Sequence, residues 1–324
     1  MDALLDIEDL RTYFETPRGV VKAVDGVDIS LNQGDTLGIV GESGCGKTVL
    51  ALTILQLIPI PPGKIVSGRI LFNDVDLLRL KEEEIRRVRG KDISMIFQEP
   101  MTSLNPVLRI GEQIAEVIRL HQGLSGRDAT SRAVEMLKLV GIPSPDRRAK
   151  EYPHQMSGGM RQRVMIAMAI ACNPRLMLAD EPTTALDVTI QAQILDLINR
   201  LKEEMGTSVI MITHDLGVIA EAAQSVAVMY AGKIVEYGVA GDIFSSPLHP
   251  YTVGLMASIP KPHEKMVRQD VLKVIPGMVP PLYHLPEGCR FQDRCKEMMD
   301  VCRRQDPDLK KNTDIHSVRC WKYA

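Results

Sequence analysis

The residues best suited to chemistry lie between Gly41 and Thr48, where the sequence reads Gly-Glu-Ser-Gly-Cys-Gly-Lys-Thr. This order fits G-x-x-x-x-G-K-S/T, in which glycines let backbone N–H groups turn towards phosphate oxygens. Lys47 would reach the β- and γ-phosphates of a nucleotide, and Thr48 would place its hydroxyl on Mg²⁺. A chance glycine turn is the alternative, but a β-rich run precedes the loop and a helix-like segment follows it, as such a site requires. Nucleotide contacts are expected from Gly41, Glu42, Ser43, Gly44, Cys45, Gly46, Lys47, Thr48 and Val49.

Two carboxylates follow a second apolar run, at Asp180 and Glu181. Asp180 suits a Mg²⁺ ligand, either directly or through water, and Glu181 suits a general base for an attacking water. Alone, these residues would be better explained as an acidic turn after a strand. The phosphate-binding loop in the same chain favours the catalytic interpretation.

The elements that must position these residues alternate between strand-like and helix-like segments. Strands are predicted over 36–40, 176–179 and 208–213, and a hairpin over 225–230 and 233–237. Helices are predicted over 156–172, entered through Ser157 as a good cap residue, and over 188–205. Strands that alternate with helices indicate an α/β fold with a parallel core.

Composition limits the possible classes of protein. The chain has 324 residues, of which 45% are hydrophobic and 25% charged, so it can bury a core of one large or two smaller domains. A formal net charge of −2 argues against binding DNA or RNA by bulk charge. The sequence contains no stretch typical of a membrane span, and its acidic start lacks the basic residues of a secretory signal. We therefore expect a cytoplasmic protein that works at a membrane only as a peripheral subunit.

A further motif runs from Ser157 to Gln162 and reads Ser-Gly-Gly-Met-Arg-Gln. With it, the chain resembles the ATP-binding-cassette (ABC) ATPases over about residues 4–256, because this motif is similar to the family signature. Gln98 resembles the Q-loop glutamine of the family, and His214 resembles its switch histidine. The segment 185–187, which reads Ala-Leu-Asp, resembles the D-loop.

This resemblance implies a P-loop ABC ATPase core with a mostly parallel sheet, and antiparallel β and helical subdomains. Family members dimerise head to tail, so Ser157, Gly158 and Gly159 of one subunit would cover ATP held by the phosphate loop of the other. The start of a helix is a suitable place for an anion. Met156 departs from the usual Leu before the signature, an apolar exchange.

The resemblance also assigns roles to single residues. The catalytic set would be Glu181, His214, Gln98 and Lys47, with Asp187 contacting nucleotide. Thr48, Gln98 and Asp180 would hold Mg²⁺. Adenine needs an aromatic platform, for which Phe14 is favoured on family spacing and Tyr13 is the alternative.

Four further segments narrow the resemblance. They are 98–106 (Gln-Glu-Pro-Met-Thr-Ser-Leu-Asn-Pro), 180–189 (Asp-Glu-Pro-Thr-Thr-Ala-Leu-Asp-Val-Thr), 249–252 (His-Pro-Tyr-Thr) and 275–277 (Ile-Pro-Gly). Together they resemble the ATPases of dipeptide/oligopeptide importers, and within them the D-type subunit.

Such a subunit would energise peptide import from the cytoplasmic face of the membrane. It would pair with a second ATPase subunit, identical or different, beneath two transmembrane permease subunits. An extracytoplasmic peptide-binding protein would be an indirect partner, and no nucleic acid would be bound. The expected domains are an ABC ATPase over 1–257, with a helical subdomain at about 100–157 that meets the permease, and an oligopeptide-transporter-type module over 258–324.

The C-terminal stretch gathers Cys289, Cys295, Cys302 and Cys320, with spacing C-x5-C-x6-C-x17-C. Four thiolates can hold Zn²⁺ or a 4Fe-4S cluster. Structural zinc sites use a closer pair, and related importer ATPases with this tail carry an iron–sulfur centre, so we expect a 4Fe-4S cluster with Zn²⁺ as the alternative. Disulfides are less favoured for a cytoplasmic chain. Four free thiols are also less favoured, because six cysteines placed at random would rarely cluster in this way. The centre would serve as a structural staple or as a redox switch.

Other functions compete with peptide import. Import of another small solute such as nickel fits the same motifs. A soluble ABC ATPase of translation or DNA repair generally joins two cassettes or inserts long coiled coils, and neither is present in this sequence. A nucleic-acid-binding tail is disfavoured, because 258–324 carries a charge of only +4.

Overall fold

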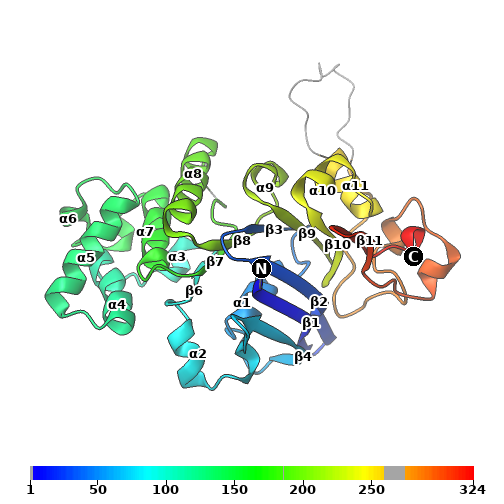
Figure 1. Cartoon of the computed structure of the whole chain (residues 1–324), viewed down its shortest axis with the longest axis horizontal. Coiled ribbons are helices and arrows are strands. Elements are labelled where there is room, and N and C mark those ends of the chain that lie inside the picture. Colours follow the sequence, from blue (N-terminus) through cyan, green and yellow to red (C-terminus); the bar gives the residue numbers. More distant parts are fainter. Residues whose placement is uncertain (1–2, 185, 259–273) are drawn as a thin grey trace, which may run out of the picture. The chain divides into compact units, whose positions relative to one another are not determined.

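The computed structural model describes residues 3–184, 186–258 and 274–324, without the side chains of Pro100 and Met101. The chain forms two compact units (Figure 1). Unit 1 comprises Met1–Leu4, Leu31–Thr36 and Asp76–Ile212. Unit 2 comprises Leu5–Ser30, Leu37–Val75 and Thr213–Ala324.

Unit 1 contains three parallel strands in the order β8-β7-β6. They are β6 (Ile93–Ile96), β7 (Leu176–Asp180) and β8 (Ser208–Ile212). Every residue of β7 and β8 is buried, which explains why these runs are continuously apolar rather than alternating. The parallel register brings the C-terminal ends of β6 and β7 to the same edge, with Ile96 opposite Ala179.

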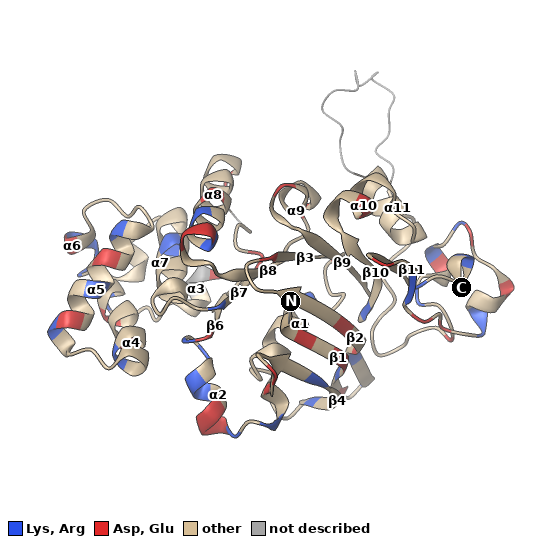
Figure 2. Cartoon of the chain, in the orientation of Figure 1, with Lys and Arg blue, Asp and Glu red and all other residues tan. Residues whose placement is uncertain are grey.

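Helices make up most of the rest of unit 1, and α4, α5 and α7 pack against one another. The helices are α2 (Glu82–Val88), α3 (Pro100–Ser103), α4 (Ile110–Gln122), α5 (Gly126–Leu139), α6 (Pro145–Arg148), α7 (Gly158–Ile170) and α8 (Val188–Met205). Helix α2 carries acidic residues in its first turn and basic residues in its last (Figure 2). This order stabilises the helix, because the charges interact favourably with the helix dipole. In the part of the chain that the structure describes, no helix is both long and apolar enough to cross a membrane.

Unit 2 begins with an antiparallel sheet in the order β2-β1-β4-β5. Its strands are β1 (Ala3–Thr16), β2 (Gly19–Asn32), β4 (Gly63–Phe72) and β5 (Val75–Asp76). Strand β2 alternates buried and exposed positions towards its end, as expected when one face of a sheet packs on a core.

A second set of strands in unit 2 has the order β11-β12-β10-β9-β3. It contains β3 (Thr36–Val40), β9 (Ser225–Tyr230), β10 (Lys233–Val239), β11 (Lys310–Thr313) and β12 (His316–Val318). Strands β3 and β9 are parallel, whereas β12 adds to β10 antiparallel. The C-terminal stretch thus continues the edge of the β9–β10 hairpin. The helices of this unit are α1 (Lys47–Ile54), α9 (Leu216–Ala222), α10 (Ala240–Ser245) and α11 (Pro250–Ala257).

Several predicted elements are confirmed. The strands expected over 36–40 and 225–230 are β3 and β9, and the helix expected over 188–205 is α8. The helix expected over 156–172 is α7, which begins two residues later and ends two residues earlier, with Ser157 at its N-cap. The second hairpin strand, β10, runs two residues further than 233–237, to Val239, where it pairs with Ser225.

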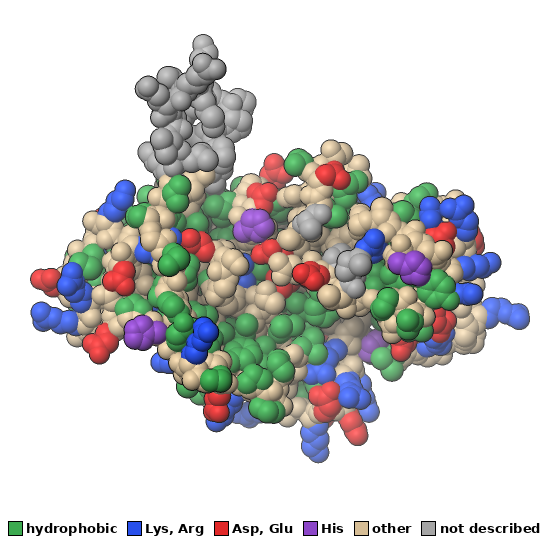
Figure 3. Space-filling view, turned by 180° about the vertical axis from the view of Figure 1, so that it is seen from behind, with side chains coloured by type: hydrophobic (Ala, Val, Ile, Leu, Met, Phe, Trp, Pro, Cys, Tyr) green, Lys and Arg blue, Asp and Glu red, His purple; other side chains and the backbone are tan. Residues whose placement is uncertain are grey.

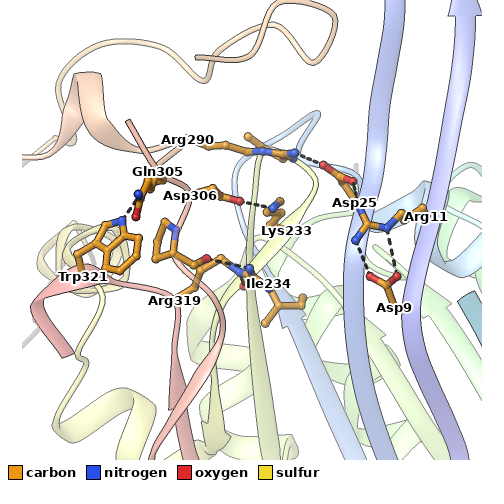
Figure 4. Close-up of polar contacts among 12 residues, drawn as sticks. Asp9, Arg11, Asp25, Lys233, Ile234, Arg290, Gln305, Asp306, Arg319 and Trp321 are labelled. Atoms are coloured by element: carbon orange, nitrogen blue, oxygen red, sulfur yellow. Dashed lines mark hydrogen bonds and ion pairs between the residues drawn. The ribbon is translucent and has the colours of Figure 1, made fainter. Parts of the chain in front are cut away.

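Buried charges in unit 2 are paired across long sequence distances. Asp25 accepts hydrogen bonds from Arg290 and Arg11 (Figure 4). It also accepts one from the Tyr13 hydroxyl. Burial alone would raise the pKa of Asp25, but the Tyr13 hydroxyl and the Arg290 charge outweigh it and lower that pKa. Lys233 of β10 forms a similar ion pair with Asp306 of the C-terminal stretch (Figure 4). These pairs attach the C-terminal stretch to β2 and β10.

A fully buried carboxylate, Glu236 on β10, organises the start of α11. It accepts hydrogen bonds from the backbone N–H groups of Leu248 (2.7 Å) and His249 (2.9 Å), and lies 2.8 Å from His316 Nε2. His249 in turn accepts the Tyr251 N–H at Nδ1 (3.0 Å) and so caps α11. Burial lowers the pKa of His249 from 6.5 to about 3.

This depressed pKa predicts a stability that depends on pH. Unfolded His249 takes up a proton below about pH 6.5 while the folded protein does not, so acid favours unfolding. From pH 7 to pH 5, this residue alone should lower the free energy of unfolding by about 2 kcal/mol. Urea denaturation at both pH values measures the change. His249→Asn keeps a helix-capping acceptor without a titrating ring and should lose this part of the slope; an equal slope in both proteins would contradict the assignment.

Candidate functional site

The phosphate loop in unit 2 packs so closely on neighbouring backbone that its first and third glycines cannot be replaced. A Cβ on Gly41 would lie 2.1 Å from the Met229 carbonyl oxygen, and a Cβ on Gly46 would lie 2.0 Å from that of Ala23. Gly46 also has a φ of 111°, in the left-handed region, and caps α1. The loop is therefore held between β9 and β2.

Lys47 begins α1, with its side chain turned back into the loop. It is 6% exposed, and its Nζ donates to the carbonyl oxygens of Gly41 (2.8 Å) and Glu42 (3.1 Å). This position suits an ammonium that binds phosphate. Thr48 is exposed at the start of the same helix, so its hydroxyl can reach a metal-bound nucleotide.

The other predicted loop residues divide by exposure. Ser43 and Gly44 are exposed, and Val49 is half-buried. Cys45 is fully buried, and its burial raises the pKa of the thiol. A protonated, inaccessible thiol is not a nucleophile.

Glu42 has two partners that sequence reasoning missed. Its backbone N–H donates to the Tyr251 hydroxyl (2.9 Å), and its carboxylate accepts two hydrogen bonds from Arg294, at 2.6 and 3.0 Å. Tyr251 belongs to the His-Pro-Tyr-Thr segment that supported the resemblance but received no role. Arg294 gave no sequence signal.

The two predicted carboxylates lie in unit 1. Asp180 ends β7 and is 1% exposed. Glu181 follows it with a φ of 46°, an unusual conformation outside glycine, and its backbone N–H donates to the Ile212 carbonyl (2.8 Å). Residues held in this region often serve function.

The Glu181 carboxylate is oriented by two neighbours. Gln98 Nε2 donates to its Oε2 (3.1 Å), and the Thr184 hydroxyl donates to the same oxygen (2.8 Å). The structure thus brings together Gln98 and Glu181, which sequence reasoning assigned separately. Thr184 was missed, although it lies only three residues beyond Glu181.

The signature residues of unit 1 form the start of α7. The Ser157 hydroxyl accepts the Met160 N–H (3.3 Å), while Gly158 is exposed. A Cβ on Gly159 would lie 2.9 Å from Ile190 of α8, so the glycine permits close packing of these helices. Asp187 is exposed and caps α8 by accepting the Ile190 N–H (3.0 Å). Ala185 of the predicted D-loop lies outside the described residues.

His214 lies in unit 2, exposed in the loop between β8 and α9. The following residue, Asp215, fixes this loop by accepting the Gly217 N–H (2.9 Å) at the start of α9. The imidazole is therefore accessible on a short, anchored segment.

The two candidate adenine platforms are neighbours on β1. Tyr13 donates its hydroxyl to Asp25 (2.5 Å), and Lys22 Nζ lies 5.8 Å from its ring centroid. Burial and this hydrogen bond raise the pKa of Tyr13. Phe14 is half-buried and pairs with Gly63 of β4. The preference for Phe14 stays a prediction.

The prediction of a metal centre in the C-terminal stretch is wrong. Cys289, Cys295, Cys302 and Cys320 do line one cavity, of about 20 Å³. Yet across 3–184, 186–258 and 274–324, no group of three or more His, Cys, Asp or Glu side chains is arranged to hold a metal ion, which removes both the 4Fe-4S cluster and Zn²⁺. Burial raises the pKa of Cys289 to about 12 and also raises those of Cys295 and Cys320. The spacing of the cysteines suggested ligands, but spacing does not fix how the side chains are arranged in the fold.

Comparison with known proteins agrees with the cassette geometry. Residues 24–184 match the family described as "ABC transporter". A solved cassette, the dimeric post-hydrolysis state of MJ0796 bound to ADP and phosphate, has a TM-score of 0.66 and 28% identity, covering 73% of this chain and 98% of its own. The fold and phosphate loop thus define an ATP-binding cassette of an ABC transporter.

The rest of the chain narrows this class. Residues 235–302 match "Oligopeptide/dipeptide transporter, C-terminal region". The probable peptide ABC transporter ATP-binding protein y4tR of Sinorhizobium fredii is 53% identical, over 99% of this chain and 95% of its own. The Bacillus subtilis oligopeptide transport protein AppD (100% and 98% covered) and dipeptide transport protein DppD (99% and 95%) are each 50% identical. The chain belongs to the oligopeptide/dipeptide transporter family of ABC ATP-binding proteins.

The close packing of the loop predicts unequal effects of two glycine substitutions. Gly46→Ala places a methyl group 2.0 Å from a carbonyl oxygen and should lower the free energy of unfolding by more than about 3 kcal/mol. Gly44 also has a positive φ, but a Cβ there would have no atom within 4 Å, so Gly44→Ala should lower the free energy of unfolding by only about 1 kcal/mol. Urea denaturation without nucleotide compares them. Equal losses would mean that backbone contact does not constrain the loop.

Proposed function

We propose that this chain is the ATP-hydrolysing subunit of an importer of dipeptides or oligopeptides. The observation that carries the proposal is the identity of 50% or more to peptide transport ATP-binding proteins over nearly the whole chain, cassette and C-terminal region alike. Shared length matters here, because a cassette alone is common to transporters of many solutes. A nickel importer or a soluble ABC ATPase is not favoured by these relatives.

Binding of ATP is assigned to the phosphate loop. Lys47 would bind the β- and γ-phosphates, since its ammonium is already held among the loop carbonyls. Thr48, Gln98 and Asp180 supply hydroxyl, amide and carboxylate oxygens, the donor types that suit a hard divalent cation. Mg²⁺ bound with ATP would neutralise charge that develops on the phosphates. Phe14 or Tyr13 would stack on adenine.

Glu181 is proposed as the general base of hydrolysis. Gln98 and Thr184 both donate to Oε2 and so orient the carboxylate, which would accept the proton of the attacking water. The water oxygen then bonds to the γ-phosphorus as the bond to the ADP oxygen breaks. His214 and Asp187 would contribute from their exposed positions, and Ser157, Gly158 and Gly159 would cover the ATP of a partner subunit.

The proposed partners are a second ATPase subunit and two transmembrane permease subunits, with a peptide-binding protein acting through the permease. The helical segment, residues 100–157 of unit 1, is proposed to meet the permease, as the family resemblance implies, and some of its apolar side chains are exposed. Val107 is 75% exposed and Leu120 is 74% exposed. Hydrophobic side chains are visible at the surface in Figure 3. The chain would act at the cytoplasmic face of the membrane, with domains at 1–257 and 258–324.

The assignment of Glu181 predicts a loss of turnover without a loss of binding. Glu181→Gln keeps the hydrogen-bonding shape but cannot accept the proton, so kcat should fall by about 100-fold or more. Binding of a fluorescent ATP analogue should stay within about threefold of the original. Glu203→Gln, an exposed carboxylate on α8, is the matched control and should leave kcat unchanged. Unchanged turnover in Glu181→Gln would remove it from this role.

The proposed assembly predicts co-purification with membrane proteins. We expect the affinity-tagged chain to co-purify with two integral membrane permease subunits and a second ATPase chain. For this test the tagged chain is expressed in the native host organism and the membranes are extracted with a mild detergent. Peptide, presented with the binding protein in proteoliposomes, should stimulate ATP hydrolysis by this complex. Recovery with ribosomes or DNA instead of membrane subunits would support a soluble ABC ATPase.

A further inference from the structure

Glu42 is a negatively charged residue inside a loop that binds the most highly charged part of a nucleotide. Its side chain is 33% exposed. An unpaired carboxylate at this point would repel phosphate oxygens, because like charges this close oppose one another even near water. The loop therefore needs something to neutralise Glu42.

Arg294 supplies that positive charge, from a short 3₁₀ turn over Gln292–Arg294. Its Nη1 and Nη2 donate to the two carboxylate oxygens of Glu42 at 2.6 and 3.0 Å, the bidentate arrangement in which a guanidinium fits a carboxylate best. The contact joins residues 252 positions apart, both within unit 2.

The C-terminal stretch also fixes the guanidinium itself. Nε donates to the Pro276 carbonyl (2.9 Å), and the guanidinium carbon lies 5.7 Å from the ring centroid of Tyr230. The Arg294 side chain is only 4% exposed, so it cannot exchange Glu42 for water. The hydrogen bonds to Glu42 raise the pKa of Arg294, which keeps it charged.

Tyr251 holds the backbone of the same residue. Its hydroxyl accepts the Glu42 N–H (2.9 Å), and it is fully buried against Tyr230 (ring centroids 4.6 Å apart) and Phe291 (5.5 Å). Glu42 is thus held by hydrogen bonds at two points, its backbone N–H by Tyr251 of α11 and its carboxylate by Arg294. Both partners lie outside the loop and its flanking strands.

We propose that Arg294 is a positioning residue of the nucleotide site: it neutralises and orients Glu42, so the C-terminal stretch sets the affinity of the phosphate loop for ATP. This inference rests on the proposed binding of ATP by Gly41–Thr48. Arg294 touches Glu42 and not the nucleotide, and its contribution is electrostatic.

The test compares Arg294→Gln, Glu42→Gln and the double variant by titration with a fluorescent ATP analogue and Mg²⁺. Arg294→Gln leaves the Glu42 charge unopposed and should raise Kd about tenfold in low salt. The increase should shrink at about 0.5 M salt, which screens exposed charge. Steady-state KM should rise with Kd while kcat changes little, because the interaction acts equally on bound ATP and on the transition state.

Rescue separates charge from structure. Adding Glu42→Gln to Arg294→Gln removes the repelling charge, so Kd should return to within about threefold of the original. A purely structural contact predicts the opposite, a double variant that binds no better than Arg294→Gln; that result, or an unchanged Kd in Arg294→Gln, overturns the proposal. Arg294→Lys keeps the charge without the bidentate geometry and should raise Kd less than Arg294→Gln.

Two controls complete the design. If Arg294→Gln does not fold, the single variant Glu42→Gln tests the proposal. In this variant the positive charge of Arg294 is no longer neutralised by Glu42, so Kd for the ATP analogue should fall about threefold. An unchanged or raised Kd would contradict the proposal. Lys47→Ala tests the proposed function separately. Binding that is absent in the original chain, or unaffected by Lys47→Ala, would refute ATP binding by this loop rather than the role of Arg294.

Discussion

Two backbone carbonyls press on the phosphate loop so closely that no side chain fits where it passes them. Strand β3 pairs in parallel with β9, with Val40 opposite Val228, and this register carries Gly41 directly onto the carbonyl of the next residue, Met229. A slip of one residue would move that carbonyl and turn the side chains of β3 to the opposite face. The start of the loop at Gly41 therefore depends on this strand pairing, and its end at Gly46 depends on the contact with Ala23 of β2.

Charge sets the second constraint on unit 2. Asp25 and Glu236 are buried, and Glu42 lies in the loop proposed to bind phosphate. Each of these carboxylates has a partner distant in sequence, which is Arg290 for Asp25, His316 for Glu236 and Arg294 for Glu42. Removing one partner of a buried pair is costly because the other remains charged and desolvated. Since residues of the C-terminal stretch supply partners for all three, that stretch completes the electrostatics of the cassette as well as the edge of its hairpin.

Local features were predictable from the sequence, and distant contacts were not. The glycine loop, the Ser157 cap and the bounds of α8 follow from neighbouring residues, whose preferences act within one turn or strand. The partnership of Glu42 with Arg294 depends on tertiary folding, for which a single arginine gives no pattern. The cysteine spacing misled for a related reason: it correctly anticipated that the thiols gather, but ligation depends on how the side chains are arranged in the fold, which spacing does not give.

The position of Arg294 in the chain has a consequence for protein synthesis. At about 5 to 20 residues per second, a ribosome needs roughly 10 to 50 s to travel from Glu42 to Arg294. During that interval the nascent chain carries its nucleotide loop with the charge of Glu42 unpaired by Arg294, and the residues of β12 have not yet been synthesised. The Glu42–Arg294 ion pair can form only when translation is almost finished. A chain released early would therefore contain every cassette motif but would lack the positive charge that pairs with Glu42.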